Sequence, residues 1–163
     1  QDTAEIDTWL ANYYQPGVPI DTQALLSQLN EGIANQLQYQ VRNAPGVQSP
    51  KETLAKGTGS CRDLATLFLE SCRRLGLASR FVSGYLVSSA AVEDIATTHA
   101  WAEIYLPGAG WRGFDATSGQ WVGGEHIAVA VHRHPEAVTP VRGAYIGPVD
   151  GATMDVHVRV EKL

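Results

Sequence analysis

The chain has 163 residues, 44% of them hydrophobic, and this length and composition predict one globular domain with a sizeable core. Twelve Lys and Arg residues against seventeen Asp and Glu residues give a net charge of -5 without a basic run. Nucleic acid and anionic membranes are therefore not expected as partners, and no apolar stretch is long enough to cross a membrane.

The first half of the chain has apolar residues at helical spacing. A short helix is predicted within residues 2–14, and a second from Asp21 to about Arg42, where Asn-Ala-Pro-Gly follows. Residues 49–52, Ser-Pro-Lys-Glu, have the pattern of an N-cap at the start of a third, short helix.

A cysteine stands at the predicted start of a fourth helix, which ends before Gly76. Ser60 is a good N-cap, Asp63 takes the capping-box position, and apolar residues follow Cys61 at i+3, i+4 and i+7. The N–H groups and dipole of a helix start favour a thiolate at Cys61, and its backbone N–H can bond an oxyanion, although the Asp63 carboxylate opposes a second negative charge. The alternative is that Cys61 is a small buried apolar residue.

The second half of the chain has the alternating pattern of β-strands. Strands are predicted over residues 78–87, 99–106, 111–115, 126–131, 142–146 and 154–161. Helices followed by antiparallel strands predict an α+β fold, in which the cysteine-bearing helix packs on an antiparallel β-sheet.

A cysteine nucleophile needs a base and a group that orients the base, and His99 and Asp115 are the candidates at the ends of two neighbouring strands. If Leu106 paired with Trp111 around a four-residue turn, the side chains of His99 and Asp115 would lie on opposite faces of the sheet. If Tyr105 pairs with Trp111, around a five-residue loop or a bulge of the same parity, His99 and Asp115 become diagonal neighbours on one face, roughly 7 Å apart. We predict this second register. Each residue alone also fits a structural role at a strand end or turn.

Three segments resemble the motifs of the transglutaminase-like superfamily in the same order: Gly59-Ser60-Cys61-Arg62-Asp63-Leu64-Ala65, Thr98-His99-Ala100-Trp101-Ala102-Glu103 and Trp111-Arg112-Gly113-Phe114-Asp115-Ala116-Thr117. The resemblance extends from about Asp21 to Glu161, with a departure at residues 132–135. It implies a papain-like α+β core with Cys61 as nucleophile, His99 as base and acid, and Asp115 as the orienting group.

The domain organisation follows from this resemblance. We interpret residues 1–20 as a lead-in segment and residues 21–163 as a transglutaminase-like catalytic domain. Because the chain begins with Gln1 and its only methionine is Met154, we expect it to be an excised domain or a processed chain of a bacterial protein.

Four further residues are candidates for the site. The Tyr39 hydroxyl is a candidate second oxyanion donor, with a buried aromatic residue near a helix end as the alternative. Ser60, Trp101 and Trp111 are expected to line the cleft, and the two tryptophans are also suited to the core.

No metal or cofactor is expected. His132 and His134, with two further C-terminal histidines, lack the ligand spacing of a zinc site. Cys61 and Cys72 lie roughly 16 Å apart along one predicted helix, too far for a disulfide, so a cytoplasmic location is expected.

The predicted activity is acyl transfer on a peptide or protein amide through a thioester on Cys61, with water or an amine as acceptor. The alternative is a transglutaminase-like binding module whose site is blocked or vestigial. Iodoacetamide labelling at low pH distinguishes the two, because only a catalytic cysteine reacts there as a thiolate.

Overall fold

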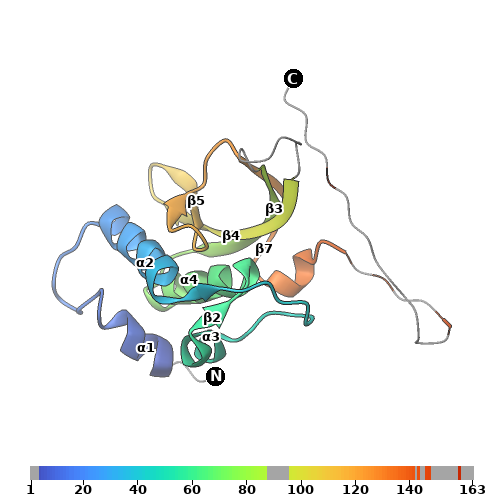
Figure 1. The fold of residues 1–163 in the computed structure, drawn as a ribbon. Coiled ribbons are helices and arrows are strands. Elements are labelled where there is room, and N and C mark those ends of the chain that lie inside the picture. Colours follow the sequence, from blue (N-terminus) through green and yellow to red (C-terminus); the bar gives the residue numbers. More distant parts are fainter. Residues whose placement is uncertain (1–3, 88–95, 142, 144–145, 148–157, 159–163) are drawn as a thin grey trace.

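Helices fill the first half of the chain and strands the second (Figure 1). The computed structural model describes residues 4–87, 96–141, 143, 146–147 and 158. No helix within these residues has the length and hydropathy to cross a membrane. The elements are α1 (Ala4–Leu10), α2 (Thr22–Gln36), β1 (Gln38–Tyr39), α3 (Pro50–Lys56), β2 (Thr58–Gly59), α4 (Cys61–Arg74), β3 (Ser79–Val87), β4 (Ala96–Leu106), β5 (Gly110–Asp115), β6 (Gln120–Trp121), β7 (His126–His132) and a 3-10 turn, Pro135–Val138.

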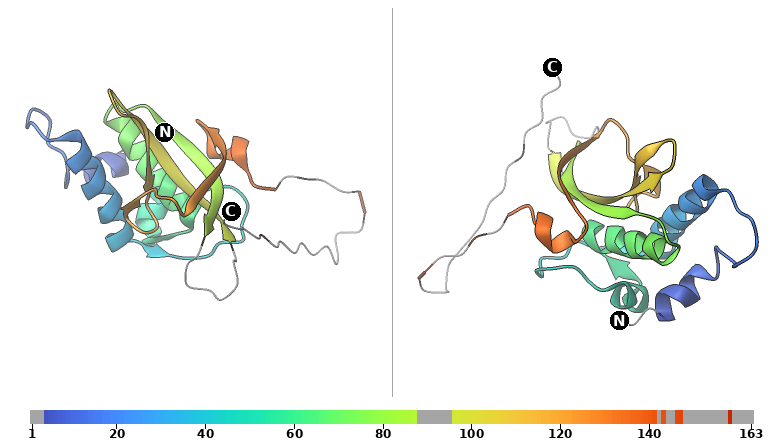
Figure 2. Two further views of the ribbon diagram at one scale, coloured as in Figure 1. Left: turned by 90° about the horizontal axis from the view of Figure 1, so that it is seen from above. Right: turned by 180° about the vertical axis from the view of Figure 1, so that it is seen from behind.

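The α+β fold is confirmed. Five antiparallel strands form a sheet in the order β6-β5-β4-β3-β7, and α4 packs against β3 and β4 on one face of it (Figure 2). α1 and α2 pack against α4 on the same side of the sheet. The predicted strands over residues 142–146 and 154–161 lie largely outside the described residues.

The core lies between α4 and the sheet. Leu64, Phe68 and Cys72 of α4 are buried there. The centroids of the Phe68 ring and of the Phe114 ring of β5 lie 5.3 Å apart. Three side chains of α1, Ile6 among them, are buried in the same core. Burying the apolar stripe of α4 stabilises this helix and fixes the position of its N-terminus relative to the strands.

The helix from Asp21 ends earlier than the sequence predicts, at Gln36 instead of near Arg42. Leu37 is extended, and the next two residues pair in parallel with β2, Tyr39 opposite Gly59. Because Gly59 lies two residues before Cys61, this pairing brings Tyr39 beside the start of α4. A continuous helix would have carried Tyr39 away from it.

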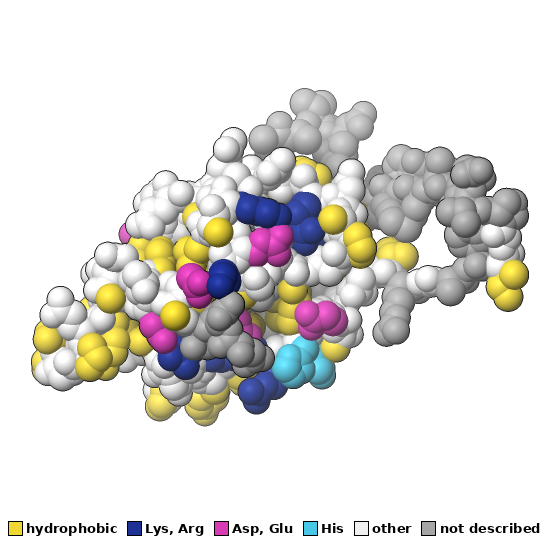
Figure 3. Space-filling view, turned by 90° about the horizontal axis from the view of Figure 1, so that it is seen from below, with side chains coloured by type: hydrophobic (Ala, Val, Ile, Leu, Met, Phe, Trp, Pro, Cys, Tyr) yellow, Lys and Arg dark blue, Asp and Glu magenta, His cyan; other side chains and the backbone are white. Residues whose placement is uncertain are grey.

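The surface near α1 and α3 carries interspersed charges of both signs. Ion pairs join Lys51 to Glu5 at 2.8 Å, Lys56 to Glu52 at 2.5 Å, and Arg74 of α4 to α1. Figure 3 shows acidic and basic side chains beside one another on the face seen from below.

Candidate active site

Cys61 is the first residue of α4, as the sequence predicts. Its side chain is partly exposed, whereas Cys72 on the same helix is fully buried. Burial raises the pKa of the Cys72 thiol well above its ordinary value. Of the two thiols, Cys61 is therefore the one that a reagent or substrate can reach.

Asp63 fixes the loop that precedes Cys61. Its buried carboxylate accepts hydrogen bonds from the Ser60 backbone N–H at 2.9 Å, the Ser60 hydroxyl at 2.7 Å and the Gln48 backbone N–H at 2.7 Å. Arg42 binds both carboxylate oxygens, at 2.9 and 3.1 Å. Burial alone would raise the pKa of Asp63, but these bonds outweigh it and hold the pKa well below its ordinary value. The negative charge of Asp63, which by itself would disfavour a thiolate at Cys61, is thus paired with the Arg42 guanidinium.

His99 and Asp115 lie on neighbouring strands in the predicted register. Tyr105 of β4 pairs with Trp111 of β5, and because Leu106 also pairs with Gly110, the loop has three residues, Pro107–Ala109, with the parity expected for five. His99 Nε2 lies 2.9 Å from Asp115 Oδ2. The strand pairing therefore brings the imidazole and the carboxylate together.

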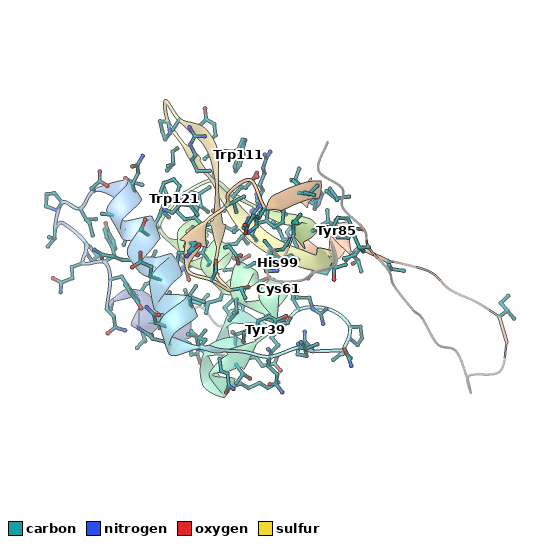
Figure 4. The ribbon with its side chains drawn as sticks, turned by 45° about the horizontal axis from the view of Figure 1, so that its top comes forward. Tyr39, Cys61, Tyr85, His99, Trp111 and Trp121 are labelled. Atoms are coloured by element: carbon teal, nitrogen blue, oxygen red, sulfur yellow. The ribbon has the colours of Figure 1, made fainter. Side chains whose placement is uncertain are left out.

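The other side of the His99 ring faces Cys61. The two side chains interact electrostatically, and Figure 4 shows Cys61 and His99 side by side. Since Nε2 is bound to Asp115, Nδ1 is the ring nitrogen available to the sulfur. Sulfur, imidazole and carboxylate thus form one row.

The electrostatics of this row favour a charged imidazole. Burial would lower the pKa of His99, but the hydrogen bond to Asp115 and the proximity of Cys61 outweigh it and raise the pKa to about 9. Burial would raise the pKa of Asp115, which is 1% exposed, but its contacts with His99 and His126 hold the pKa well below its ordinary value. The carboxylate therefore carries its charge at neutral pH and stabilises a charge on His99.

Tyr39 lies beside Cys61, as Figure 4 shows, and its hydroxyl is close enough to interact electrostatically with the thiol. Its side chain is 48% exposed, so the buried-aromatic alternative is wrong for this residue. Burial of the hydroxyl and the proximity of Cys61 raise the pKa of Tyr39, which keeps the phenol protonated at neutral pH. The hydroxyl can therefore donate a hydrogen bond at this site.

The other three candidates do not line an open cleft beside the sulfur. Ser60 is buried and its hydroxyl is bound to Asp63, so it secures the helix start and does not face a cleft. Trp101 is 1% exposed and forms a buried wall, its ring 6.3 Å from that of His99. Trp111 is not brought to this site: Figure 4 shows it away from Cys61 and His99, at the hairpin end of the sheet. The Arg80 guanidinium lies 4.2 Å from its ring centroid.

His126 is the site residue that the sequence reasoning missed. Its Nε2 lies 3.1 Å from Asp115 Oδ2, the oxygen that His99 also contacts, and its ring lies edge-on to Trp101 with centroids 5.2 Å apart. His126 begins a strand that does not pair with the strand of Asp115, so no sequence pattern indicated that the two side chains would meet. It does not lie with His132, which is at the other end of β7.

Among the described residues, one group has side chains close enough to hold a metal ion. The candidate ligand atoms of His99, Asp115 and His126 lie within 4.8 Å of one another. Two imidazoles and a carboxylate are ligands that zinc accepts.

Comparison with known proteins supports the family that the motifs resemble. The model of the transglutaminase-like superfamily matches residues 15–116. A protein of Mycobacterium tuberculosis without a characterised function is 34% identical over 118 residues, covering 67% of this chain and 38% of that protein. A similar relative from Mycobacterium leprae is 34% identical over 119 residues, covering 69% of this chain and 40% of its own length. The chain thus spans about two fifths of these relatives.

Solved structures share the fold. A candidate cysteine protease from Cytophaga hutchinsonii superposes with a TM-score of 0.67 at 23% identity, covering 83% of this chain and 45% of that one. LapG from Legionella pneumophila gives a TM-score of 0.61 at 16% identity, covering 81% of this chain and 75% of that one. From the matched family model and the cysteine, histidine and aspartate motifs within it, the chain belongs to the transglutaminase-like superfamily.

Proposed function

We propose that this domain catalyses acyl transfer on a peptide or protein amide, with Cys61, His99 and Asp115 as a catalytic triad. The observation that carries the proposal is the His99–Asp115 hydrogen bond, 2.9 Å from ring nitrogen to carboxylate, with the Cys61 side chain beside the same imidazole. The exposed end of the row is a thiol at a helix N-terminus, where the dipole favours negative charge.

Two half-reactions follow. The Cys61 sulfur attacks the amide carbon, its proton having passed to His99, and a carbon–sulfur bond forms. His99 returns the proton to the leaving nitrogen as the carbon–nitrogen bond breaks, which leaves a thioester and a free amine. Water or a second amine then attacks the thioester, His99 accepts its proton, and the sulfur leaves and is reprotonated.

Charge develops on the carbonyl oxygen in both tetrahedral intermediates. The backbone N–H of Cys61, at the first position of α4, has no partner within the helix and can donate to this oxygen. The Tyr39 hydroxyl, beside the sulfur, supplies the second donor. Asp115 keeps His99 in the required tautomer and stabilises the imidazolium.

Labelling with iodoacetamide between pH 5 and 9, followed by peptide mapping, tests the proposal. We expect Cys61 to be labelled well below pH 7 while Cys72 stays unlabelled, and the His99→Asn variant to lose the low-pH reaction. His132→Asn is the matched control, because His132 is exposed and contacts none of the triad. If Cys61 reacts only as an ordinary thiol in the folded protein, the catalytic proposal is overturned.

Mass spectrometry of the protein with a peptide library then identifies the acyl donor. Added glycine ethyl ester distinguishes the acceptors: an acid product shows hydrolysis, and an amide of the added amine shows transamidation. Absence of both an acyl-enzyme and a product in a protein whose Cys61 is activated would leave a binding module as the function.

A further inference from the structure

His126 shares the carboxylate oxygen that holds His99. Its Nε2 lies 3.1 Å from Asp115 Oδ2, against 2.9 Å for His99, and the two histidine rings have centroids 5.8 Å apart. The His126 side chain is 9% exposed. A largely enclosed histidine on the orienting carboxylate is not used in the two half-reactions above.

The contacts of His126 fix which nitrogen carries its proton. The Gly123 backbone N–H donates to Nδ1 at 3.4 Å, so Nδ1 is the acceptor and a neutral ring carries its hydrogen on Nε2. Nε2–H therefore donates to Asp115. Thr117 N–H donates to the second carboxylate oxygen at 2.9 Å, so three N–H groups hold the Asp115 carboxylate.

The backbone around His126 is built to bring it there. Ser83 of β3 pairs with Ala130 and Gly84 with Ala128, so β7 has an extra residue at this point, a β-bulge that re-aims its first residues. A side chain at Gly84 would meet the Ile127 carbonyl oxygen at 2.1 Å and the Trp101 ring at 2.7 Å. Glycine thus lets β7 approach closely enough for His126 to rest on Trp101.

We infer that His126 is a positioning residue for catalysis: its Nε2–H holds the Asp115 carboxylate in the orientation that binds His99. This inference rests on the proposed function. Without this donor the carboxylate keeps one fixed contact besides His99, from Thr117, and can rotate about its side-chain bonds. The imidazole then loses part of its alignment toward Cys61.

The hydrogen-bonded arrangement is favoured over a metal centre by the contacts themselves. Each candidate ligand atom of His99, Asp115 and His126 already has a hydrogen-bond partner within the group. A cation would have to displace both hydrogen bonds to the one oxygen that aligns His99. The experiment below separates the two arrangements.

The test compares the labelling of Cys61 by iodoacetamide at pH 6 in variants of His126. His126→Phe keeps the ring contact with Trp101 and removes the N–H, and we expect a rate about tenfold below that of the unmodified protein, equivalent to one pH unit in the profile. His126→Gln, whose amide reaches the position of Nε2, should restore the rate to within about threefold, whereas the shorter His126→Asn should not. His132→Phe, at the other end of β7, is the matched control and should leave the rate unchanged.

The pH profile of labelling gives a readout that a purely structural role would not move. The titratable groups at the site are Cys61 of α4, Tyr39 of β1, His99 of β4, Asp115 of β5 and His126 of β7, and His126→Phe alters one of them directly. We expect the acid limb of the profile to move to higher pH in His126→Phe and to return in His126→Gln, with all variants unfolding at similar temperatures.

Three results overturn the inference. The first is that Cys61 reacts at low pH in the unmodified protein and is labelled at the same rate in His126→Phe. This result would leave the proposed function unaffected. Another is a loss in His126→Phe that Gln does not restore. The third is a loss of labelling in the unmodified protein after treatment with EDTA, which would make the group a metal centre. Failure of the proposed function is distinct, because Cys61 of the unmodified protein would then show no low-pH reaction.

Discussion

The guanidinium of Arg42 binds both oxygens of the Asp63 carboxylate, although the two residues are 21 positions apart in the chain. The Asp63 side chain is fully buried and that of Arg42 is 22% exposed. This ion pair joins the segment after β1 to the first turn of α4. It therefore fixes the position of Tyr39 relative to Cys61.

Removing Arg42 should destabilise the fold. Arg42→Ala leaves a buried carboxylate without its counter-charge, and we expect the free energy of unfolding to fall by about 3–5 kcal/mol. Arg74→Ala is the matched control, because its ion pair with Asp7 is exposed and should cost at most about 1 kcal/mol. Urea unfolding followed by circular dichroism measures both. Equal losses in the two variants would contradict the structural role of the buried pair.

Asp115→Asn should impair the site without unfolding it. The amide is close to isosteric but carries no charge, so the pKa of His99 falls and the imidazolium no longer stabilises a negative sulfur. We expect labelling of Cys61 at pH 6 to slow by about tenfold or more. Asp21→Asn, at the exposed N-cap of α2, is a control of the same chemical change. An unchanged rate in Asp115→Asn would remove Asp115 from the triad.

Tyr39→Phe should separate acyl transfer from alkylation. Loss of an oxyanion donor typically costs about 10²–10³ in rate, so acylation of Cys61 by p-nitrophenyl acetate should slow to that extent. Alkylation by iodoacetamide develops no oxyanion and should be unchanged. Tyr105→Phe, on an exposed tyrosine that packs against Trp111 away from the site, serves as control. Equal effects on both reactions would mean that Tyr39 acts on the sulfur instead.

Stability should fall as the pH rises from about 6.5 to 9. The pKa of His99 is raised to about 9 in the folded protein from an ordinary value of 6.5, so the folded state binds the proton more tightly than the unfolded state. This contribution is complete below pH 6.5 and is lost as the pH passes through 9. Urea midpoints measured across this range should decline in the unmodified protein and decline less in His99→Asn.

Below pH 4 a second loss is expected. The pKa values of Asp63 and Asp115 are lowered by folding, so these carboxylates stabilise the protein above their unfolded pKa near 3.9 and lose this contribution as they protonate. Asp63→Asn should flatten the acid side of the same stability curve. A stability curve of the unmodified protein that does not decline between pH 4 and 2 would contradict both lowered values.

Gly84→Ala tests the close approach of β7 to β3. The added carbon would meet backbone and the Trp101 ring, and we expect a loss of about 1–3 kcal/mol together with slower labelling of Cys61, because His126 is displaced. A side chain at Gly124 would have nothing within 4 Å, so Gly124→Ala is the control. Unchanged stability in Gly84→Ala would show that β7 can move without cost.

Local sequence patterns determined much of this protein. The N-cap Ser60, the capping-box Asp63 and the apolar spacing after Cys61 act within one or two helical turns, so the start of α4 could be located from the sequence. Strand alternation likewise gave the α+β class. It left two hairpin registers open, and the requirement that His99 and Asp115 share one face selected the register that the structure shows.

Tertiary structure alone decided three features of the site. Tyr39 reaches Cys61 because α2 stops at Gln36 to pair with β2, a pairing between segments that no local propensity encodes. His126 reaches Asp115 through a β-bulge in a strand that is distant in sequence from its partner β3. Trp111 is held at the far end of the sheet by the hairpin register. Short-range sequence patterns determine which helix or strand carries each chemical group. Pairing between distant segments determines which of these groups come into contact.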